Sequence, residues 1–425
     1  MKRLFLFVLA ASLIIPPAWG GGAVPPAWGL VLRGTGGAST ASKPAYPAEL
    51  NTAATLAPDI AAYLFHQGYG STTRNYVAHA DSSILTNATA EEGLWVSDGL
   101  EFNANYEHVR GLLMSNLNGT GSIVFRFKKT SNPSNYRYWF VQDDDYANFC
   151  VVMSSAEHDF YIGNKVNYSD RTSYLDGNWH QMVYTWDDSA NERKWYMDGA
   201  LKQNLTTSFS WSGTAGDWLR IGGRPTGLGR FAGGIFEYFY IYDGVLTSTQ
   251  ISSLYADPYQ MWASCGTEIQ SASTESGTSR EPIGDASDRM MAASRFTAAE
   301  TATICSVKVR LKKVGSPDKA MNFAIFSDNS GQPGTRIGNW STPYQTENLS
   351  TTLDSDILFG DIGAGIVSGT VYWLVGRVDG SADSSNYVQW RLGATVTDRE
   401  LDKGDGAGNW VDEGAYNGIY WLYKR

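Results

Sequence analysis

The chain of 425 residues carries a formal net charge of −10, and aromatic residues make up 13% of it. Proteins bind nucleic acids through a basic stripe, and because Lys and Arg form no long run here, we expect no nucleic-acid partner. The length suits two or three domains, and the 45 Gly with abundant Tyr and Trp are typical of aromatic-rich β-sandwiches joined by many turns.

The N-terminus has the pattern of a secretory signal peptide. Two basic residues precede an apolar run from Leu4 to Ile15, which is shorter than the about 20 residues that a membrane-spanning helix needs. A Pro pair and a small-x-small "AWG" follow. We therefore expect a signal peptide at residues 1–20, no stable transmembrane span, and a secreted or cell-surface protein. The alternative is an uncleaved segment that anchors the chain in a larger assembly. Residues 21–51, rich in Gly, Pro, Ser and Thr, are predicted to be a linker.

Residues 52–262 show the alternation of apolar and other side chains that predicts β-strands. In three segments the alternation places one apolar set on a common face: Ile123, Phe125 and Phe127; Met182, Tyr184 and Trp186; and Phe236, Tyr238, Tyr240 and Tyr242. Asp198-Gly199 between two such runs predicts a hairpin turn. Near the end of the domain, Thr247 and Gln250 have the spacing of a capping box, which predicts a helix that Pro258 closes.

These segments resemble the laminin G-like, concanavalin A-like family. The stretches "YLFHQGYGSTTRN", "DGNWHQMVYTWD", "LRIGGR" and "FAGGIFEYFYIYDGVLTSTQISSLYADPYQMW" occur in the order of that family. The resemblance covers residues 52–262 and implies a two-sheet jelly roll that binds glycans or surface glycoproteins. The ending "DPYQMW" resembles versions in bacterial surface proteins and in tailed-phage virion proteins. It therefore also implies an alternative, a decoration or tail receptor-binding protein at the virion surface with other virion proteins as partners.

A polar stretch, residues 263–288, is predicted to link this domain to a second β-sandwich of unassigned family at residues 289–425. The expected fold class is all-β, with two tandem β-sandwiches of which the first is a concanavalin A-like, laminin G-like jelly roll. Three cysteines occur. Cys150 lies in the apolar run "FCVVM" and is expected to be buried. Cys305 is expected to point inward with Val307, Val309 and Leu311, and its pairing with Cys265 stays open.

Catalysis has one candidate strand, "EHDFYIG". Retaining glycosidases of the laminarinase type share this fold and need two carboxylates about 5–5.5 Å apart as nucleophile and acid. Glu157 and Asp159 alternate here, but Tyr161 stands where the second carboxylate belongs. We therefore predict a structural strand and a protein that is not an enzyme, with a polysaccharide-active enzyme as the less favoured alternative. His180, beside Trp179 at a strand start, is expected to have a structural role.

Two kinds of binding residue are predicted. Asp143, Asp144 and Asp145 in "QDDDYAN" offer hard oxygen ligands for Ca²⁺, as at the loop rim of many laminin G-like domains, and a solvated turn is the alternative. A weaker calcium candidate is "DKGDGAGN" at residues 402–409. Trp211 and Trp410 lie in Gly- and Ser- or Asn-rich stretches, where an indole can stack on a sugar ring. Packing against the sandwich edge is the alternative for both.

Overall fold

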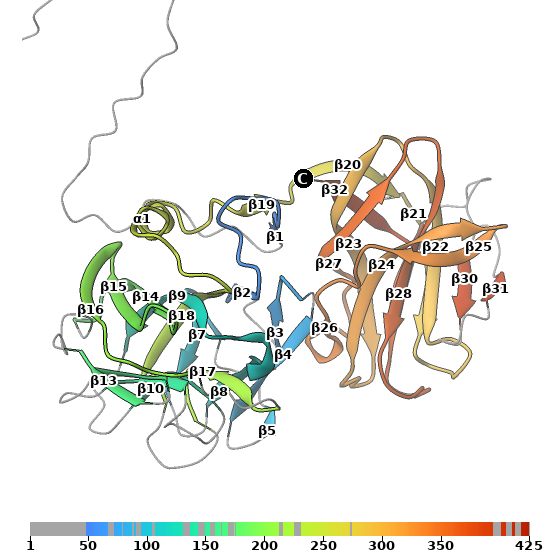
Figure 1. The fold of residues 1–425 in the computed structure, drawn as a ribbon. Helices are drawn as coiled ribbons and strands as arrows, with labels where there is room; N and C mark the ends of the chain where they lie inside the picture. The colour runs from blue at the N-terminus through green and yellow to red at the C-terminus, as the bar shows by residue number, and fades with distance from the viewer. Residues whose placement is uncertain are drawn as a thin grey trace, which may run out of the picture. The chain divides into compact units, whose positions relative to one another are not determined.

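The structure is a computed structural model, and it describes residues 48–66, 72–78, 80–86, 89–90, 95–103, 107–130, 137–142, 149–153, 158–162, 164–168, 174, 176–211, 216–224, 231–272, 274–393, 401–404, 410–412 and 418–424. Antiparallel strands form two sandwiches (Figure 1), which confirms the predicted fold class. We call the first, β1 to β19, the jelly roll and the second, β20 to β32, the C-terminal sandwich. No helix in the described part of the chain is long and apolar enough to cross a membrane.

Two sheets build the jelly roll. One runs in the order β16 (Ala200–Leu205), β15 (Glu192–Met197), β14 (Trp179–Asp187), β9 (Thr120–Lys129), β18 (Gly234–Tyr242), β2 (Ala61–Leu64) and β3 (Thr72–Asn75), with β7 (Gly99–Phe102) also on β18 and β6 (Trp95–Val96) on β7. The other runs β13 (Asn164–Asn167), β12 (His158–Ile162), β11 (Phe149–Met153), β10 (Arg137–Gln142), β17 (Trp218–Ile221), β8 (His108–Leu113), β4 (Ala80–Thr86) and β5 (Thr89–Ala90), and β3 pairs with β4. A short 3₁₀ turn, Met114–Asn116, follows β8.

The core between these sheets is aromatic. It contains the predicted faces of β9 and β14, with Phe125 stacked on Tyr184 at 6.2 Å between ring centroids. Burying such rings removes apolar surface from water, and each contributes about 1.5–3 kcal/mol relative to an exposed position. Cys150 is buried as expected, in a small cluster on the outer face of β11.

The outer face of β9, β14 and β18 is also covered. The segment from β1 (Ala48–Leu50) to residue 60, helix α1 (Ser248–Ala256) and β19 (Trp262–Ser264) lie over it, and β1 pairs with β19. The predicted capping box is present, because the Thr247 side chain accepts from the Gln250 backbone and the Gln250 side chain accepts from the Thr247 backbone N–H. The predicted turn at Asp198-Gly199 is confirmed, with φ of 52° and 75°.

One predicted strand face was wrong. Phe236 does not share a face with Tyr238, Tyr240 and Tyr242 but joins the central core with Phe239. The pairing of β18 with β9 shifts by one residue between Phe236 and Tyr238. Such a β-bulge inserts one extra residue, which exchanges the two faces of the strand beyond it. The three tyrosines consequently point toward the covering segment.

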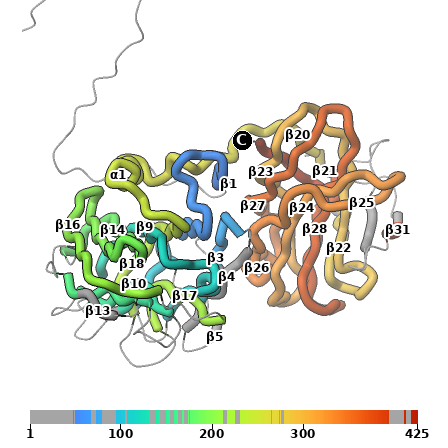
Figure 2. The backbone as a smooth tube through the Cα atoms, in the orientation of Figure 1, coloured from blue at the N-terminus to red at the C-terminus, as the bar shows by residue number. Residues whose placement is uncertain are grey.

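Two sheets also build the C-terminal sandwich. The first runs β20 (Thr267–Ala272), β32 (Tyr420–Lys424), β23 (Ala302–Val314), β29 (Tyr387–Gly393) and β21 (Glu275–Ile283), with β27 (Ser355–Ile366) also on β23. The second runs β25 (Gln332–Ile337), β24 (Ala320–Asn329), β28 (Val371–Val378), β22 (Met291–Thr297), β30 (Leu401–Gly404) and β31 (Trp410–Asp412), with β26 (Tyr344–Gln345) on β24 and a 3₁₀ turn at Thr346–Asn348. Figure 2 traces β22, β28 and β24 as neighbours.

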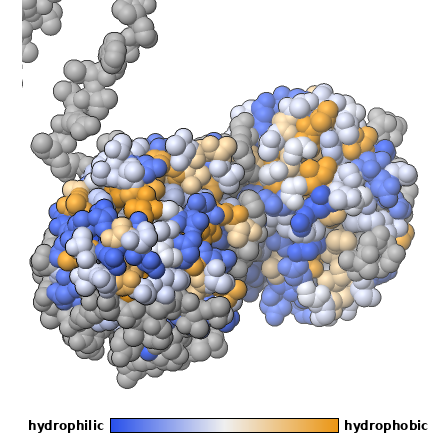
Figure 3. Space-filling model, in the orientation of Figure 1, coloured by the Kyte–Doolittle hydropathy of each residue, from blue (hydrophilic) through white to orange (hydrophobic). Residues whose placement is uncertain are grey.

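Two expectations for this part of the chain were wrong. Residues 263–288 are not a linker throughout, because β20 and β21 lie within them and pair with β32 and β29. Cys305 does not continue the core row of Val307, because the pairing of β23 shifts between Ile304 and Ser306 and places Ile304 in the core instead. Cys305 is joined by a disulfide to Cys265, with 5.9 Å between their Cα atoms. On the face that Figure 3 shows, hydrophilic and hydrophobic residues are interspersed.

Candidate functional site

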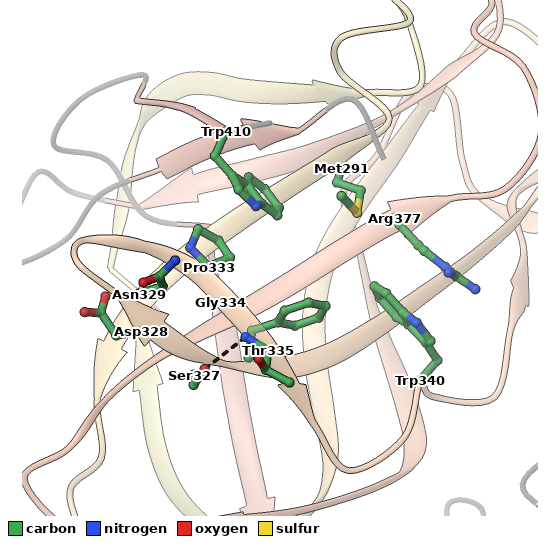
Figure 4. A pocket seen from close by; sticks show the side chains of 11 residues that line it. Met291, Ser327, Asp328, Asn329, Pro333, Gly334, Thr335, Trp340, Arg377 and Trp410 are labelled. Atoms are coloured by element: carbon green, nitrogen blue, oxygen red, sulfur yellow. Dashed lines mark hydrogen bonds between the residues drawn. The ribbon is translucent and has the colours of Figure 1, made fainter. Parts of the chain in front are cut away.

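A cavity of about 760 Å³ lies on the outer face of the sheet that contains β22, β24 and β28 (Figure 4). Its volume is in the range of small-molecule binding sites, about 300–1,000 Å³. The described residues that line it are Met291, Phe326, Ser327, Asp328, Asn329, Pro333, Gly334, Thr335, Trp340, Arg377 and Trp410. They come from the adjacent strands β25, β24, β28 and β22, from β31, and from the segment that follows β25.

Strand alternation provides the apolar floor. In β28, Leu374 points into the sandwich core, whereas Trp373 and Val375 point outward. In β22, Ala292 points inward and Met291 outward in the same way. The outward residues form a second apolar cluster on this face, against which Phe326, Trp340 and Trp410 pack at its margin. The outer face of this sheet therefore carries a small hydrophobic surface of its own.

The hairpin between β24 and β25 forms one wall. Ser330 and Gly331 have φ of 57° and 91°, the left-handed pair of a tight two-residue turn. Two further bonds fix the wall: the backbone N–H of Gly331 donates to Asp328 Oδ2 at 3.3 Å, and that of Thr335 donates to Ser327 Oγ at 3.0 Å (Figure 4). Asp328 and Asn329 are thereby held beside the cavity.

Two indoles flank the cavity, and Figure 4 shows them at opposite ends of the lining. Trp340 is half-buried and packs edge-on to Phe326 with 5.7 Å between ring centroids. The guanidinium carbon of Arg377 lies 4.1 Å from the centroid of the Trp340 ring. Trp410 is half-buried on β31, and its carbonyl accepts from Gln332 Nε2 at 3.5 Å. An apolar ring face beside polar groups can stack on the C–H face of a sugar.

The charged groups of the cavity are held in place. Asp328 Oδ1 accepts from the Trp373 indole N–H at 2.9 Å and lies 3.9 Å from Arg295 Nε. Arg377 Nε lies 3.3 Å from Asp379 Oδ1, and both of these side chains are partly exposed. Among the described lining residues Asp328 is the one carboxylate. The arrangement provides an acceptor, a cation and the Asn329 amide beside aromatic surface, which suits a ligand rich in hydroxyl groups.

Of the predicted ligand residues, Trp410 lies in this cavity and Trp211 does not. The Trp211 ring stacks on Trp186 with 6.1 Å between centroids and meets Phe149 edge-on at 5.2 Å. It packs against the jelly-roll core and does not line this cavity. Trp340 was missed, although "GNWSTP" shows the same signal of an indole among turn residues.

The predicted calcium ligands Asp143, Asp144 and Asp145 lie outside the described residues, as do residues 405–409 of the weaker candidate, so both stay predictions. Within the ranges that the structure does describe, no group of three His, Cys, Asp or Glu is placed to hold a metal ion.

The candidate catalytic strand is β12. Phe160 and Ile162 face the jelly-roll core as expected. Asp159 is buried and its Oδ1 accepts from Asn167 Nδ2 at 2.6 Å, whereas Glu157 lies outside the described residues. Tyr161 is half-buried and packs on the outer cluster with Cys150. The predicted strand is therefore present at residues 158–162, and its structural, non-catalytic role stays a prediction.

His180 connects two turns of the jelly roll. Its Nδ1 lies 2.8 Å from Asp198 Oδ2 and its Nε2 lies 3.0 Å from Asp176 Oδ1. The hydrogen bond to Asp198 is the main cause that raises the pKa of His180, and the backbone N–H of Asn178 lowers the pKa of Asp176 to about 2. Asp198 also lines a cavity of about 10 Å³, which is room for about one water molecule, and His180 is not among the residues that line it. This geometry supports the structural role predicted for His180.

The fold and the site define the class: an all-β protein with a jelly roll and a C-terminal sandwich that carries an aromatic cavity. Residues 103–252 match the family model of the concanavalin A-like lectin/glucanases superfamily, which confirms the laminin G-like jelly roll expected there. No curated protein matches the sequence significantly.

Solved structures that are similar to this chain include a sialidase, the CBM40 of another sialidase and one domain of an arabinanase. A sialidase of Trypanosoma rangeli in complex with sialic acid is 16% identical, over 47% of this chain and 33% of its own, with a TM-score of 0.35. The CBM40 of a Ruminococcus gnavus IT-sialidase, bound to α2,3-sialyllactose, is 19% identical over 33% of this chain and 84% of its own, with a TM-score of 0.29. Domain 4 of an extracellular arabinanase from Geobacillus stearothermophilus, in complex with arabinotriose, is 14% identical over 49% of this chain and 98% of its own, with a TM-score of 0.32. This chain thus aligns with only a third of the Trypanosoma sialidase.

Proposed function

We propose that this protein is a non-catalytic recognition protein that binds glycans outside the cell, and that the cavity of the C-terminal sandwich is its binding site. The observation that carries the proposal is the placement of two indoles, Trp340 and Trp410, at opposite ends of a cavity of about 760 Å³ that also contains Asp328, Asn329 and Arg377. Glycan binding is also what the lectin-type jelly roll led us to expect, but here the site lies in the other sandwich.

The physical argument concerns the two faces of a sugar. A pyranose ring presents apolar C–H groups on its faces and hydroxyl groups around its edge, so it needs an aromatic plane and polar groups together. Single exposed aromatic side chains are common on protein surfaces and need no functional explanation. Two indoles that border one cavity, with a hydrogen-bond acceptor and a donor beside them, together provide the groups that a sugar ring needs. A ligand of a few sugar units fits the volume of this cavity.

A non-catalytic role is supported by the carboxylates. Glycoside hydrolysis needs a pair of them, about 5–5.5 Å apart for retention and about 6.5–9.5 Å apart for inversion. The described lining of the cavity includes one, Asp328, and its Oδ1 is engaged by the Trp373 indole. Asp159 on β12 is buried and hydrogen-bonded to Asn167.

An extracellular location is supported by two features. Residues 1–20 have the composition of a secretory signal, and Cys265 and Cys305 form a disulfide, a bond that persists in oxidising compartments. The mass of the mature protein tests this part: loss of residues 1–20 is expected, and a chain that keeps them would favour the alternative of a virion component.

Binding is tested with a glycan array followed by calorimetry on the saccharides that bind. Trp340→Ala and Trp410→Ala are each expected to weaken binding by about tenfold or more, because each removes a stacking surface of roughly 1.5–3 kcal/mol. Trp218→Ala is the matched control, since Trp218 is also half-buried and has an arginine, Arg110, 4.6 Å from its ring centroid, but lies in the jelly roll. Wild-type affinity in both cavity variants, with the fold verified by thermal melting, would refute the site.

A further inference from the structure

We infer that the cavity selects saccharides that carry a negative charge, as a carboxylate or a sulfate ester, and that Arg377 is the residue that distinguishes them from neutral ones. This inference rests on the proposed function. Arg377 lies on β28 and faces outward into the cavity, with its guanidinium carbon 4.1 Å from the centroid of the Trp340 ring. Contact with the ring positions the cation beside the surface on which a sugar would stack.

The guanidinium of Arg377 is available to a ligand. The carboxylate that pairs with it is Asp379, 3.3 Å away, and the two side chains are 36% and 50% exposed. An ion pair with this much exposure contributes about 0–1 kcal/mol, because water screens it. A ligand anion that binds inside the cavity, where less water surrounds the pair, can therefore replace Asp379 at little cost.

Two further arginines lie beside the cavity. Arg336 is exposed on β25, with its guanidinium carbon 5.9 Å from the Trp340 centroid, and Arg295 lies 3.9 Å from Asp328. Asp328 would repel an anionic ligand, but Arg295 offsets its charge, and its two oxygens accept hydrogen bonds from Trp373 and from the backbone of Gly331. Arg295 and Arg336 thus add two cations beside Arg377, in a chain whose net charge is −10.

Arginine is suited to this selection. Its planar guanidinium donates two parallel N–H bonds to a carboxylate or a sulfate, and such charge-assisted bonds are about twice as strong as neutral ones. A sugar hydroxyl accepts a hydrogen bond from the same group without the charge. The affinity for one saccharide should therefore fall when its acid is neutralised, and should also fall with salt concentration, because the pair remains partly exposed.

The test uses pairs of saccharides that differ only in charge: oligogalacturonates with their methyl esters, sulfated oligosaccharides with their desulfated forms, and any further acidic array binder with its neutralised form. The two arms also identify which anion is preferred. Wild type should bind the charged member at least tenfold more tightly, and Arg377→Gln should remove that difference. Arg310→Gln is the matched control, because Arg310 lies over Trp421 at 5.4 Å and pairs with Asp356 at 2.7 Å on the opposite sheet.

The results separate the two claims. If wild type binds saccharides but prefers neutral members or shows no preference, or if Arg377→Gln keeps the preference for charge, the inference is overturned and the proposed function stands. If wild type binds no saccharide, the proposed function fails and the inference fails with it. The comparison of charged and neutralised ligands on wild type needs no variant, so it decides the point even if Arg377→Gln folds poorly.

Discussion

Reduction of the disulfide between Cys265 and Cys305 is expected to destabilise the C-terminal sandwich substantially. The bond connects the segment before β20 to β23 and spans a sequence separation of 40 residues. In the chain-entropy model, closing a loop of this length removes enough freedom from the unfolded chain to stabilise the fold by about 4 kcal/mol. Domains of about 150–250 residues shift by about 2–4 °C per kcal/mol, so the melting temperature should fall by about 8–16 °C.

Calorimetry of the protein with and without a phosphine reductant measures this shift. Cys265 is only half-buried, so Cys265→Ser removes the bond with little effect on packing, and its melting should not respond to the reductant. Cys150 is buried in the jelly roll and takes no part in this disulfide, so Cys150→Ala should keep the full response of the C-terminal transition to the reductant.

Thiol labelling of the unfolded, unreduced chain supplies the outcome that refutes the reasoning. One reactive thiol, that of Cys150, is expected among the three cysteines. If all three label in protein purified from an oxidising compartment, or if wild type and Cys265→Ser melt alike under both conditions, the bond does not contribute to the stability of this sandwich.

Three further predictions concern the jelly roll. Two carboxylates raise the pKa of His180 above its ordinary 6.5. The protonated imidazole therefore stabilises the folded protein fully below pH 6.5, and this contribution is lost as the pH rises through the raised pKa. In denaturant melts the advantage of wild type over His180→Gln in unfolding free energy should shrink above pH 6.5, and a difference that stays constant with pH would contradict this. Gly121→Ala places a Cβ 2.3 Å from the Trp186 ring and should cost about 1–3 kcal/mol of unfolding free energy, whereas Gly244→Ala, with open space, should cost far less. Thr247→Ala removes the helix cap and should cost about 1 kcal/mol in chemical unfolding, which Thr247→Ser should largely restore.

Strand alternation made much of the fold predictable, because a period of two in the sequence translates directly into two faces of a sheet. The faces of β9 and β14, the turn at Asp198-Gly199 and the helix cap at Thr247 followed from local residues alone. The two errors in facing, at Phe236 and at Cys305, each come from a β-bulge. A bulge depends on how a strand pairs with its neighbour, and the strand's own alternation contains no sign of it.

The candidate site was predictable only in part. An indole among turn residues is a signal shared by Trp211, Trp340 and Trp410, yet Trp211 stacks on Trp186 in the core while the other two border a cavity. The signal does not distinguish them, because the difference depends on which strands lie beside each indole. The sequence around Arg377 does not indicate a binding residue. Its role in the cavity depends on its contact with Trp340, which is distant in sequence and is brought near by the order of the strands.

The position of a bound oligosaccharide tests the central claim most directly. A crystal structure of the protein with a saccharide that binds in solution should show a sugar ring in the cavity on β22, β24 and β28, stacked on Trp410 or Trp340. A saccharide bound at the loops of the jelly roll, with this cavity empty, would contradict the account.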